Sequence, residues 1–309
     1  ASNLAIGGAD GNTIEFWMKK NTFNSSVAHK ETIFDLTNQI DSRVYLYLSA
    51  SANGSSPINL SLNSGSTTST TSIGSSNFTT SSISDNNWHH YAITLKTSSL
   101  GILCRFFVDS RLENESYIIN SPINEVKPKT KGVVAAIGAK ITSSIGDGQI
   151  FSASFDEFRF WKKERSGKQI GQNWFTQVGG GTDDSTDNVD LGVYFKFNEG
   201  ITGNTTKDSI VLDYSGRLSN GVFRGYSTSH SRDTGSAIVL AGVASKEYKD
   251  PTIYSSHPDY ITKLAEYKLS GSIQDSQNSG LMINYFPSWL VDEDKQNGEG
   301  VKKLVQIMA

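Results

Sequence analysis

The segment Thr13-Ile14-Glu15-Phe16-Trp17-Met18-Lys19 decides the fold of this chain. Its apolar residues alternate, so that Ile14, Phe16 and Met18 share one face of an extended strand and the intervening residues share the other. Further short runs rich in β-branched and aromatic residues follow between polar turns, at 33–36, 43–48, 58–62, 90–95 and 105–108. Their spacing is too irregular for a solenoid, and it predicts an all-β, two-sheet antiparallel sandwich over residues 1–178.

The composition is that of a globular chain with a packed core. The 309 residues are 36% hydrophobic, with 28 Gly and 6 Pro, and this length suits one large unit and one smaller unit. The net charge is −3 and no run is dense in Lys and Arg, so nucleic acid is not expected as a partner. No apolar stretch approaches the roughly 20 residues that span a bilayer, so membrane insertion is not expected. The single cysteine, Cys104, lies in an apolar run and is expected to be a buried thiol.

A short helix and a linker follow the predicted sandwich. Ile170, Trp174 and Phe175 are spaced for one amphipathic helix, and Ser166 precedes them as a typical N-cap. Residues 179–188 are rich in Gly, Asp, Ser and Thr and have little apolar content, which favours a linker.

The remainder divides into two segments. Residues 189–249 contain short strands, and we expect this segment either to pack on the sandwich or to be the remnant of a second such domain. Residues 250–309 change character, because prolines divide the region and apolar residues at helical spacing predict helices over 258–269 and 299–308. We expect a small mixed extension that serves as an interaction segment and continues in sequence beyond residue 309.

Several motifs occur in an order that resembles laminin-G-like and pentraxin-type jelly rolls of the concanavalin A-like kind. They are Ile14 to Lys19, then Trp88-His89-His90-Tyr91-Ala92-Ile93-Thr94, Phe107-Val108-Asp109-Ser110, Ile137-Gly138 and Phe155-Asp156-Glu157-Phe158-Arg159-Phe160-Trp161. The resemblance implies two curved antiparallel sheets, with the strand that begins at Trp88 and the strand that contains Asp156 contributing to the core. The period-2 pattern of Tyr91, Ile93 and Leu95 agrees with a sandwich strand.

The C-terminal part is similar to segments of tailed-phage virion structural proteins. The similarity lies in residues 250–258 and in residues 285–290 with the acidic positions that follow them. It implies a module of a virion or of an extracellular surface, where its partners would be glycans or neighbouring virion or surface proteins.

The sequence gives no reason to expect an enzyme. Concanavalin A-like folds also occur in glycoside hydrolases, which place two carboxylates across the scissile bond. The neighbours Asp156 and Glu157 are expected on opposite faces of a strand, where they could not act on one bond. With five His and one Cys, a tetrahedral zinc site is hard to assemble.

Calcium is the metal that the residues favour. The ion prefers hard oxygen ligands from Asp, Asn and loop carbonyls, and the resembled family often carries one. Asp10 and Asn12, in the loop 8–12, and Asp156 are the candidate ligands. Asp10 and Asn12 could equally form the turn that leads into Thr13, and Asp156 could bond a neighbouring loop.

Glycan recognition requires aromatic faces for stacking, together with amide and carboxylate groups on a rigid scaffold. The aromatic candidates are Trp17, Tyr45, Tyr47 and Trp161. We therefore expect a non-enzymatic module that binds carbohydrate or protein. Two alternatives remain open, which are an architectural spacer without a ligand and a binding domain appended to a secreted hydrolase.

Overall fold

The structure is a computed structural model of the whole chain. It describes residues 2–24, 26, 29–50, 56–118, 126–127, 129–141, 145–148, 151–174, 177–178, 189–199, 202–226 and 237. The chain divides into two compact units, and the sandwich is the unit formed by Ala1–Trp174 and Val178–Ala237. The linker expected at 179–188 and the extension expected at 250–309 lie outside the described residues.

One layer of the sandwich is a six-stranded antiparallel sheet, in which β1 lies near the centre and every residue of it except Lys19 is buried. The order across this sheet is β13-β12-β1-β6-β7-β8. The strands are β1 (Asn12–Lys19), β6 (Trp88–Ser98), β7 (Gly101–Val108), β8 (Arg111–Ile118), β12 (Ser154–Trp161) and β13 (Leu191–Phe195).

The other layer is a five-stranded antiparallel sheet in the order β5-β4-β3-β2-β9. Its strands are β2 (Glu31–Thr37), β3 (Ser42–Leu48), β4 (Ile58–Ser64), β5 (Thr67–Ser72) and β9 (Val134–Ile137). Two small hairpins add β10 (Lys140–Ile141) with β11 (Ile145–Gly148), and β14 (Ile210–Val211) with β15 (Gly221–Val222). The helices are η1 (Ser2–Leu4), α1 (Thr80–Ile83), α2 (Gly167–Asn173) and α4 (Thr205–Asp208).

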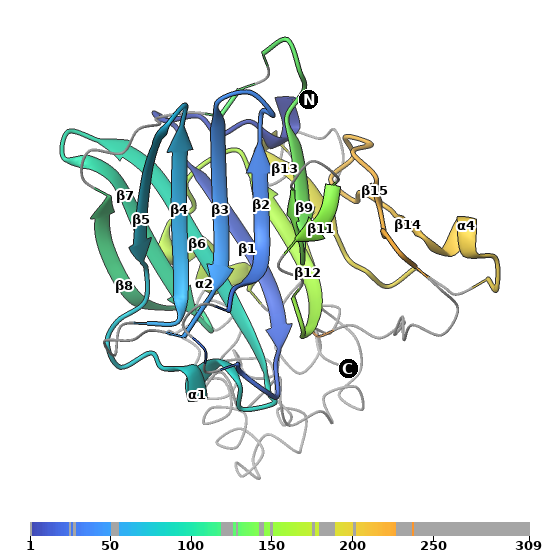
Figure 1. The fold of residues 1–309 in the computed structure, drawn as a ribbon, viewed down its shortest axis with the longest axis horizontal. Helices are drawn as coiled ribbons and strands as arrows, with labels where there is room; N and C mark the ends of the chain where they lie inside the picture. The colour runs from blue at the N-terminus through green and yellow to red at the C-terminus, as the bar shows by residue number, and fades with distance from the viewer. Residues whose placement is uncertain are drawn as a thin grey trace, which may run out of the picture. The chain divides into compact units, whose positions relative to one another are not determined.

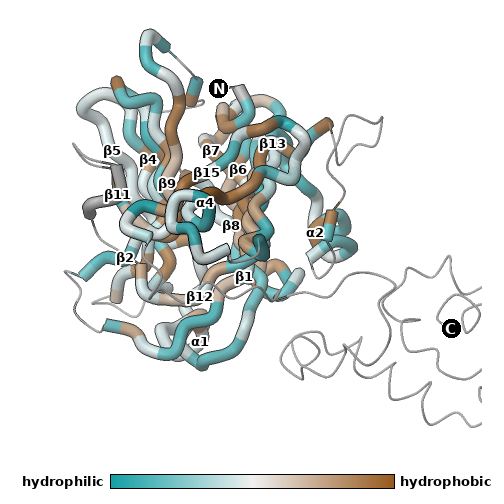
Figure 2. The backbone as a smooth tube through the Cα atoms, turned by 90° about the vertical axis from the view of Figure 1, so that its right-hand side faces the viewer, coloured by the Kyte–Doolittle hydropathy of each residue, from teal (hydrophilic) through white to brown (hydrophobic). Residues whose placement is uncertain are grey.

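The core fills the space between the two sheets. Phe34 of the five-stranded sheet packs against Phe158 and Phe160 of the six-stranded sheet, with ring centroids 5.4 Å and 6.2 Å apart. Inward-facing residues of both layers, Phe16 and Leu46 among them, are fully buried in the same cluster. Figure 1 shows the five-stranded sheet in front of the six-stranded one, and the side view of Figure 2 shows the two layers next to each other. The predicted two-sheet antiparallel sandwich is confirmed.

Strand β13, from the segment 189–249, forms an edge of the six-stranded sheet. Asp213 attaches the following turn to it, because Oδ1 accepts the amide protons of Tyr194 and Ser215 and Oδ2 accepts that of Ser219. The sandwich therefore includes residues on both sides of 179–188. No helix in the described part of the chain is long and apolar enough to span a bilayer.

Helix α2 lies on the outer face of the six-stranded sheet, where Ile170 packs against Ala92 and Phe107. Its start is fixed by Ser166, whose Oγ accepts the amide proton of Gln169, while Gln169 Oε1 accepts the amide proton of Ser166. The predicted helix and its cap are both present.

The thiol of Cys104 is inside the core. Its residue is 1% exposed, and burial raises the pKa of the thiol to about 12. The expected buried cysteine is confirmed, and at neutral pH the side chain is a small apolar group.

The start of β6 is less buried than the middle of the strand. Tyr91, Ile93 and Leu95 are buried, but Trp88 is half-buried, because it pairs with Lys19 where β1 ends. The next residue, His89, lies between two carboxylates: its Nδ1 is 2.7 Å from Asp109 Oδ2 and its Nε2 is 3.0 Å from Asp85 Oδ2. Burial by itself would lower the pKa of His89, but the hydrogen bonds and charges of Asp109 and Asp85 outweigh it and raise the pKa to about 9.

The doubly paired His89 predicts a pH-dependent stability. Because the pKa of the folded state is raised, the stabilisation is fully present below the ordinary value of 6.5 and is lost as the pH rises through about 9. We expect His89→Gln to lower the free energy of unfolding at pH 6 by roughly 2 kcal/mol, and much less at pH 10. Urea unfolding at a series of pH values measures this. A deficit that is the same at both pH values would contradict the ion-pair interpretation.

Candidate functional site

The outward side chains of the five-stranded sheet form three rows across β2, β3, β4 and β5. Val44, Leu46 and Leu48 of β3 point into the core, so the residues between them point outward. We call the outward surface the tyrosine face. In strand register its rows are Thr37, Arg43, Asn63 and Thr68; Asp35, Tyr45, Ser61 and Thr70; and Thr32, Tyr47, Asn59 and Ser72.

Two stacked tyrosines occupy the middle of this face. The rings of Tyr45 and Tyr47 are nearly parallel, with centroids 4.7 Å apart and an interplanar angle of 16°. Lys140 Nζ lies over the Tyr45 ring at 5.1 Å from its centroid, and Lys30 Nζ lies over the Tyr47 ring at 4.9 Å. The two tyrosines are 5% and 6% exposed, and burial raises the pKa of Tyr45 to about 12. The pair is on the outer face, as glycan stacking requires, but lysine side chains cover its rings.

A buried carboxylate orients an arginine beside the tyrosines. Asp35 is 0% exposed, and its Oδ1 lies 3.0 Å from Arg43 Nε. Its Oδ2 accepts the amide proton of Ile141 at 2.7 Å, and Arg43 Nη2 donates to the carbonyl of the same residue. Burial raises the pKa of Asp35 more than the Ile141 amide and the Arg43 charge lower it. The guanidinium is thus held in one orientation at the edge of the ring pair.

Hydroxyl and amide groups extend from the tyrosines toward the β5 edge. Asn63 Nδ2 donates to Thr68 Oγ1 at 2.6 Å, and Thr70 Oγ1 donates to Ser61 Oγ at 3.0 Å. Thr68 and Thr70 are exposed. A regular sheet therefore presents aromatic, cationic, amide and hydroxyl groups on one surface, and these are the groups that bind sugars.

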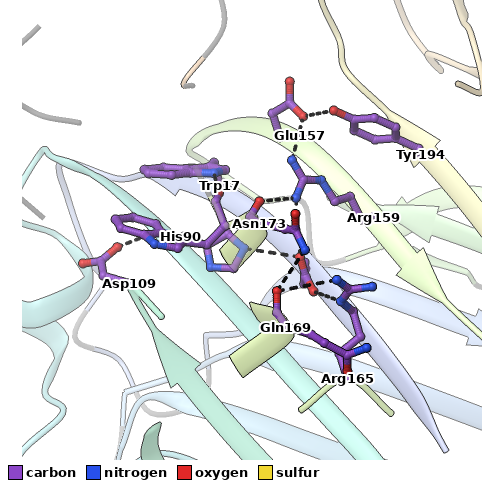
Figure 3. Close-up of polar contacts among 11 residues, drawn as sticks. Trp17, His90, Asp109, Glu157, Arg159, Arg165, Gln169, Asn173 and Tyr194 are labelled. Carbon is purple, nitrogen blue, oxygen red and sulfur yellow. Dashed lines mark hydrogen bonds and ion pairs between the residues drawn. The ribbon is translucent and has the colours of Figure 1, made fainter. Parts of the chain in front are cut away.

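Both tryptophan candidates lie on the opposite sheet, Trp17 on β1 and Trp161 on β12, and Figure 3 shows the surroundings of Trp17. Trp17 and Trp161 are each 0% exposed. Trp17 stacks on Trp174 at 5.4 Å and donates its Nε1 proton to the Trp174 carbonyl at 2.9 Å, while the Arg165 guanidinium lies 3.8 Å from the Trp161 ring centroid. Neither ring is open to stack on a glycan, because Trp174 covers Trp17, and Trp161 is packed with Leu191 and Tyr194 beneath the Arg165 guanidinium.

The same outer face holds a buried charged cluster around Glu15, and Figure 3 labels three residues that surround it, His90, Arg159 and Arg165. Its carboxylate lies 3.7 Å from Arg159 Nη1, 3.7 Å from Arg165 Nε and 3.7 Å from His90 Nε2. Burial would raise the pKa of Glu15, but the nearby His90 and the positive charges of Arg165 and Arg159 together lower it. Arg159 Nη1 also donates to the Asn173 carbonyl at 2.8 Å, so the cluster anchors α2. Alternation placed Glu15 on this face, but nothing in the sequence showed that α2 would bury it.

The three proposed calcium ligands do not form one site. Asn12 is buried, and its amide is used by the backbone: Oδ1 accepts the Gly7 amide proton and Nδ2 donates to the Ala5 and Trp161 carbonyls. Asp10 is exposed in the turn before β1. Asp156 pairs with Trp17, near the other end of β1 and roughly 15 Å along the strand.

Other metal-ligating side chains do not form a site either in the part of the chain that the structure describes. Among the described residues, no group of three or more His, Cys, Asp and Glu side chains is placed to hold a metal ion. Calcium bound through Asp10, Asn12 and Asp156 together does not fit this geometry.

The expectation that Asp156 and Glu157 face opposite ways is also wrong. A β-bulge lies between the pairs Glu15↔Arg159 and Trp17↔Asp156, and Glu157 has a φ of 51°. Asp156 therefore shares the outer face with its partner Trp17, and Glu157 reaches the same face, where it contacts Arg159 and accepts a hydrogen bond from the Tyr194 hydroxyl. The residues are 5% and 1% exposed. Burial, together with the charge of Glu157, raises the pKa of Asp156 to about 7.

The raised pKa of Asp156 makes a second prediction about stability. A carboxyl group with a raised folded-state pKa stabilises the fold below its ordinary value of 3.8, and this contribution is lost as the pH rises through about 7. We expect Asp156→Asn to stabilise the protein relative to wild type by on the order of 3 kcal/mol at pH 8, and by much less at pH 4. Parallel unfolding experiments at the two pH values measure the difference. Equal effects at pH 4 and pH 8 would show that the carboxyl does not titrate in this range.

The family described as the concanavalin A-like lectin/glucanases superfamily matches residues 2–171, and the chain belongs to it. No curated protein sequence matches the chain.

Solved structures give low-identity similarities. A proposed carbohydrate-binding protein of Bacteroides ovatus is 19% identical, with a TM-score of 0.44 over 69% of this chain and 51% of its own, so the chain spans about half of that protein. The SAP-like pentraxin of Limulus polyphemus is 15% identical, with a TM-score of 0.34 over 54% of this chain and 70% of its own. The CBM40 of the Ruminococcus gnavus IT-sialidase is 12% identical, with a TM-score of 0.36 over 53% of this chain and 82% of its own.

Proposed function

We propose that this protein is a non-enzymatic glycan-binding module and that the tyrosine face is its binding surface. The observation that carries the proposal is the stacked pair Tyr45 and Tyr47, set among amide and hydroxyl groups on the outside of a regular sheet. We propose further that the module belongs to a virion or to an extracellular surface protein, which it attaches to glycans.

The chemistry of the tyrosine face suits a sugar. A pyranose ring has C–H groups that pack on aromatic rings, and hydroxyl groups that exchange hydrogen bonds with amides and hydroxyls. Asn59 and Asn63 supply amides, and Thr68 and Thr70 supply hydroxyls, all from strands whose backbone is fixed by the sheet. Because the groups are held in register before a ligand arrives, little conformational entropy is lost on binding.

The family name includes glucanases, and glycoside hydrolases act through a pair of carboxylates, so the state of Asp156 and Glu157 bears on the proposal. Asp156 and Glu157 lie on one face, but Asp156 Oδ2 accepts the amide proton of Ala237 and Glu157 is in contact with Arg159 and Tyr194. With exposures of 5% and 1%, the pair offers no room for a glycosidic bond and an attacking water. This burial, rather than opposite faces, supports a binding role.

A second candidate function is docking to a neighbouring structural protein. The hairpin of β14 and β15 and the turn within it expose apolar side chains, with Leu218 83% exposed and Val222 64% exposed. Exposed apolar groups in one region are typical of protein contacts. Retained assembly on deletion of this hairpin would count against this candidate.

The proposal predicts that the tyrosines are required for binding. Tyr47→Ala removes one ring of the stack and is expected to weaken binding about five- to tenfold, since stacking of a sugar on an aromatic ring contributes on the order of 1 kcal/mol. The measurement is binding of the full chain to a printed panel of neutral and acidic oligosaccharides, followed by calorimetry with the sugars that are retained. Tyr117→Ala is the matched control, because Tyr117 is 41% exposed on β8 of the other sheet. Equal losses in the two variants, or none in Tyr47→Ala, would reject the tyrosine face.

The proposal also predicts that bound oligosaccharides are not cleaved. Incubation of the full chain with each retained sugar, followed by measurement of new reducing ends, is expected to show no turnover at any pH from 4 to 9. Turnover that disappears in Glu157→Gln would show instead that the buried carboxylates are catalytic.

A further inference from the structure

We propose that the tyrosine face selects acidic sugars, with Lys30, Arg43 and Lys140 receiving a carboxylate beside the ring pair. The inference rests on the proposed glycan-binding function and adds the chemical class of the ligand. It follows from how charge is distributed around Tyr45 and Tyr47.

Positive charge is concentrated at the tyrosines in a chain whose net charge is −3. Lys140 covers one ring, Lys30 covers the other, and Arg43 lies in the adjacent row of the same strand. Burial lowers the pKa of Lys140, and the positive charges of Arg43 and Lys30 lower it further. The three cations therefore lie close enough to repel one another, and an anion placed among them would relieve that repulsion.

Among the residues whose side chains the structure describes, the carboxylate that lies near these three cations is Asp35. Other acids of the neighbouring segments are engaged elsewhere: Glu31 pairs with Lys20 at 2.7 Å, and Asp41 pairs with Lys129 at 2.6 Å. Asp35 is itself occupied by Arg43 Nε and by the Ile141 amide. Among the described side chains around the ring pair, three cations therefore face one carboxylate.

The geometry favours a planar carboxylate as the ligand group. Asp35 and the Ile141 carbonyl hold Arg43 through Nε and Nη2, which fixes the plane of a guanidinium that is about a quarter exposed, at 26%. A fixed guanidinium matches a carboxylate in shape, whereas lysine ammonium groups act as point charges that adjust to it.

Movement of the two lysine side chains would expose the buried tyrosine rings to a ligand. Lys30 and Lys140 are half-buried side chains with long flexible stems, and cation–π contacts at partly exposed sites are weak. A carboxylate offers each ammonium a full charge and hydrogen bonds, so it would draw both away from the rings and uncover the faces on which the sugar stacks. Neutral sugars provide no such exchange.

The test compares each acidic sugar with its own uncharged form. Oligogalacturonate, oligoglucuronate and sialyllactose, each with its methyl ester, are titrated into the full chain by calorimetry at low and high salt. We expect at least one acid form to bind roughly tenfold or more tightly than its ester, and this preference to shrink as the salt rises. Lys30→Gln and Lys140→Gln are each expected to reduce the preference several-fold. Lys129→Gln is the matched control, since that lysine pairs with Asp41 and not with the ring pair.

The outcomes separate the inference from the function on which it rests. Equal affinity for acids and esters would overturn the inference and leave the glycan-binding function standing. Binding of a sulfated dextran oligomer as tightly as the best carboxylated sugar would overturn the selection of carboxylates. No binding of any sugar, charged or neutral, would overturn both proposals.

Discussion

Glu15 holds a carboxylate out of contact with water at the centre of the six-stranded sheet, and the outer half of the structure is arranged around that charge. A buried, ionised carboxylate is costly unless cations and hydrogen-bond donors surround it. Arg159 comes from the adjacent strand, His90 from the strand on the other side, and Arg165 from the segment that leads into α2. The negative charge therefore couples three parts of the chain that are far apart in sequence.

This cluster makes the two outer faces of the sandwich unequal. Arg159 and Trp17 both bond to backbone carbonyls at the end of α2, so this end of the helix is fixed to the six-stranded sheet and Trp174 covers Trp17. The five-stranded sheet has no such helix among the described residues, and its outward rows carry the tyrosines, amides and hydroxyls. In the proposed function, stability and recognition belong to opposite surfaces, so that ligand contacts can vary without disturbing the charged cluster.

Strand alternation predicts which face of a sheet a side chain occupies. It does not predict whether another segment of the chain covers that face. The pattern of β1 correctly separated Phe16 from Glu15 and Trp17. Whether an outward residue meets solvent depends on segments distant in sequence. The indole of Trp174, more than 150 residues away, covers Trp17.

The sequence also did not predict the face of Glu157 or the positions of the two lysines beside the tyrosines. The bulge at Glu157 adds one residue to β12 and so changes the face on which the Glu157 carboxylate lies. No glycine or proline in this strand indicates a bulge in the sequence. Asp35 and Arg43 lie in adjacent strands and share a face by alternation, but Lys30 and Lys140 meet the tyrosines only through the folded chain. No residue pattern near either lysine distinguishes it from an ordinary surface lysine.

The inertness of Cys104 has a practical consequence. Its thiol is enclosed by the core and stays protonated well above neutral pH, so thiol-directed reagents would find almost no thiolate in the native protein. A cysteine placed at exposed Thr68 would then be the sole reactive thiol, and a fluorophore attached there would sit at the edge of the tyrosine face. The native sequence is therefore already suited to single-site spectroscopic labelling, with no background cysteine to remove.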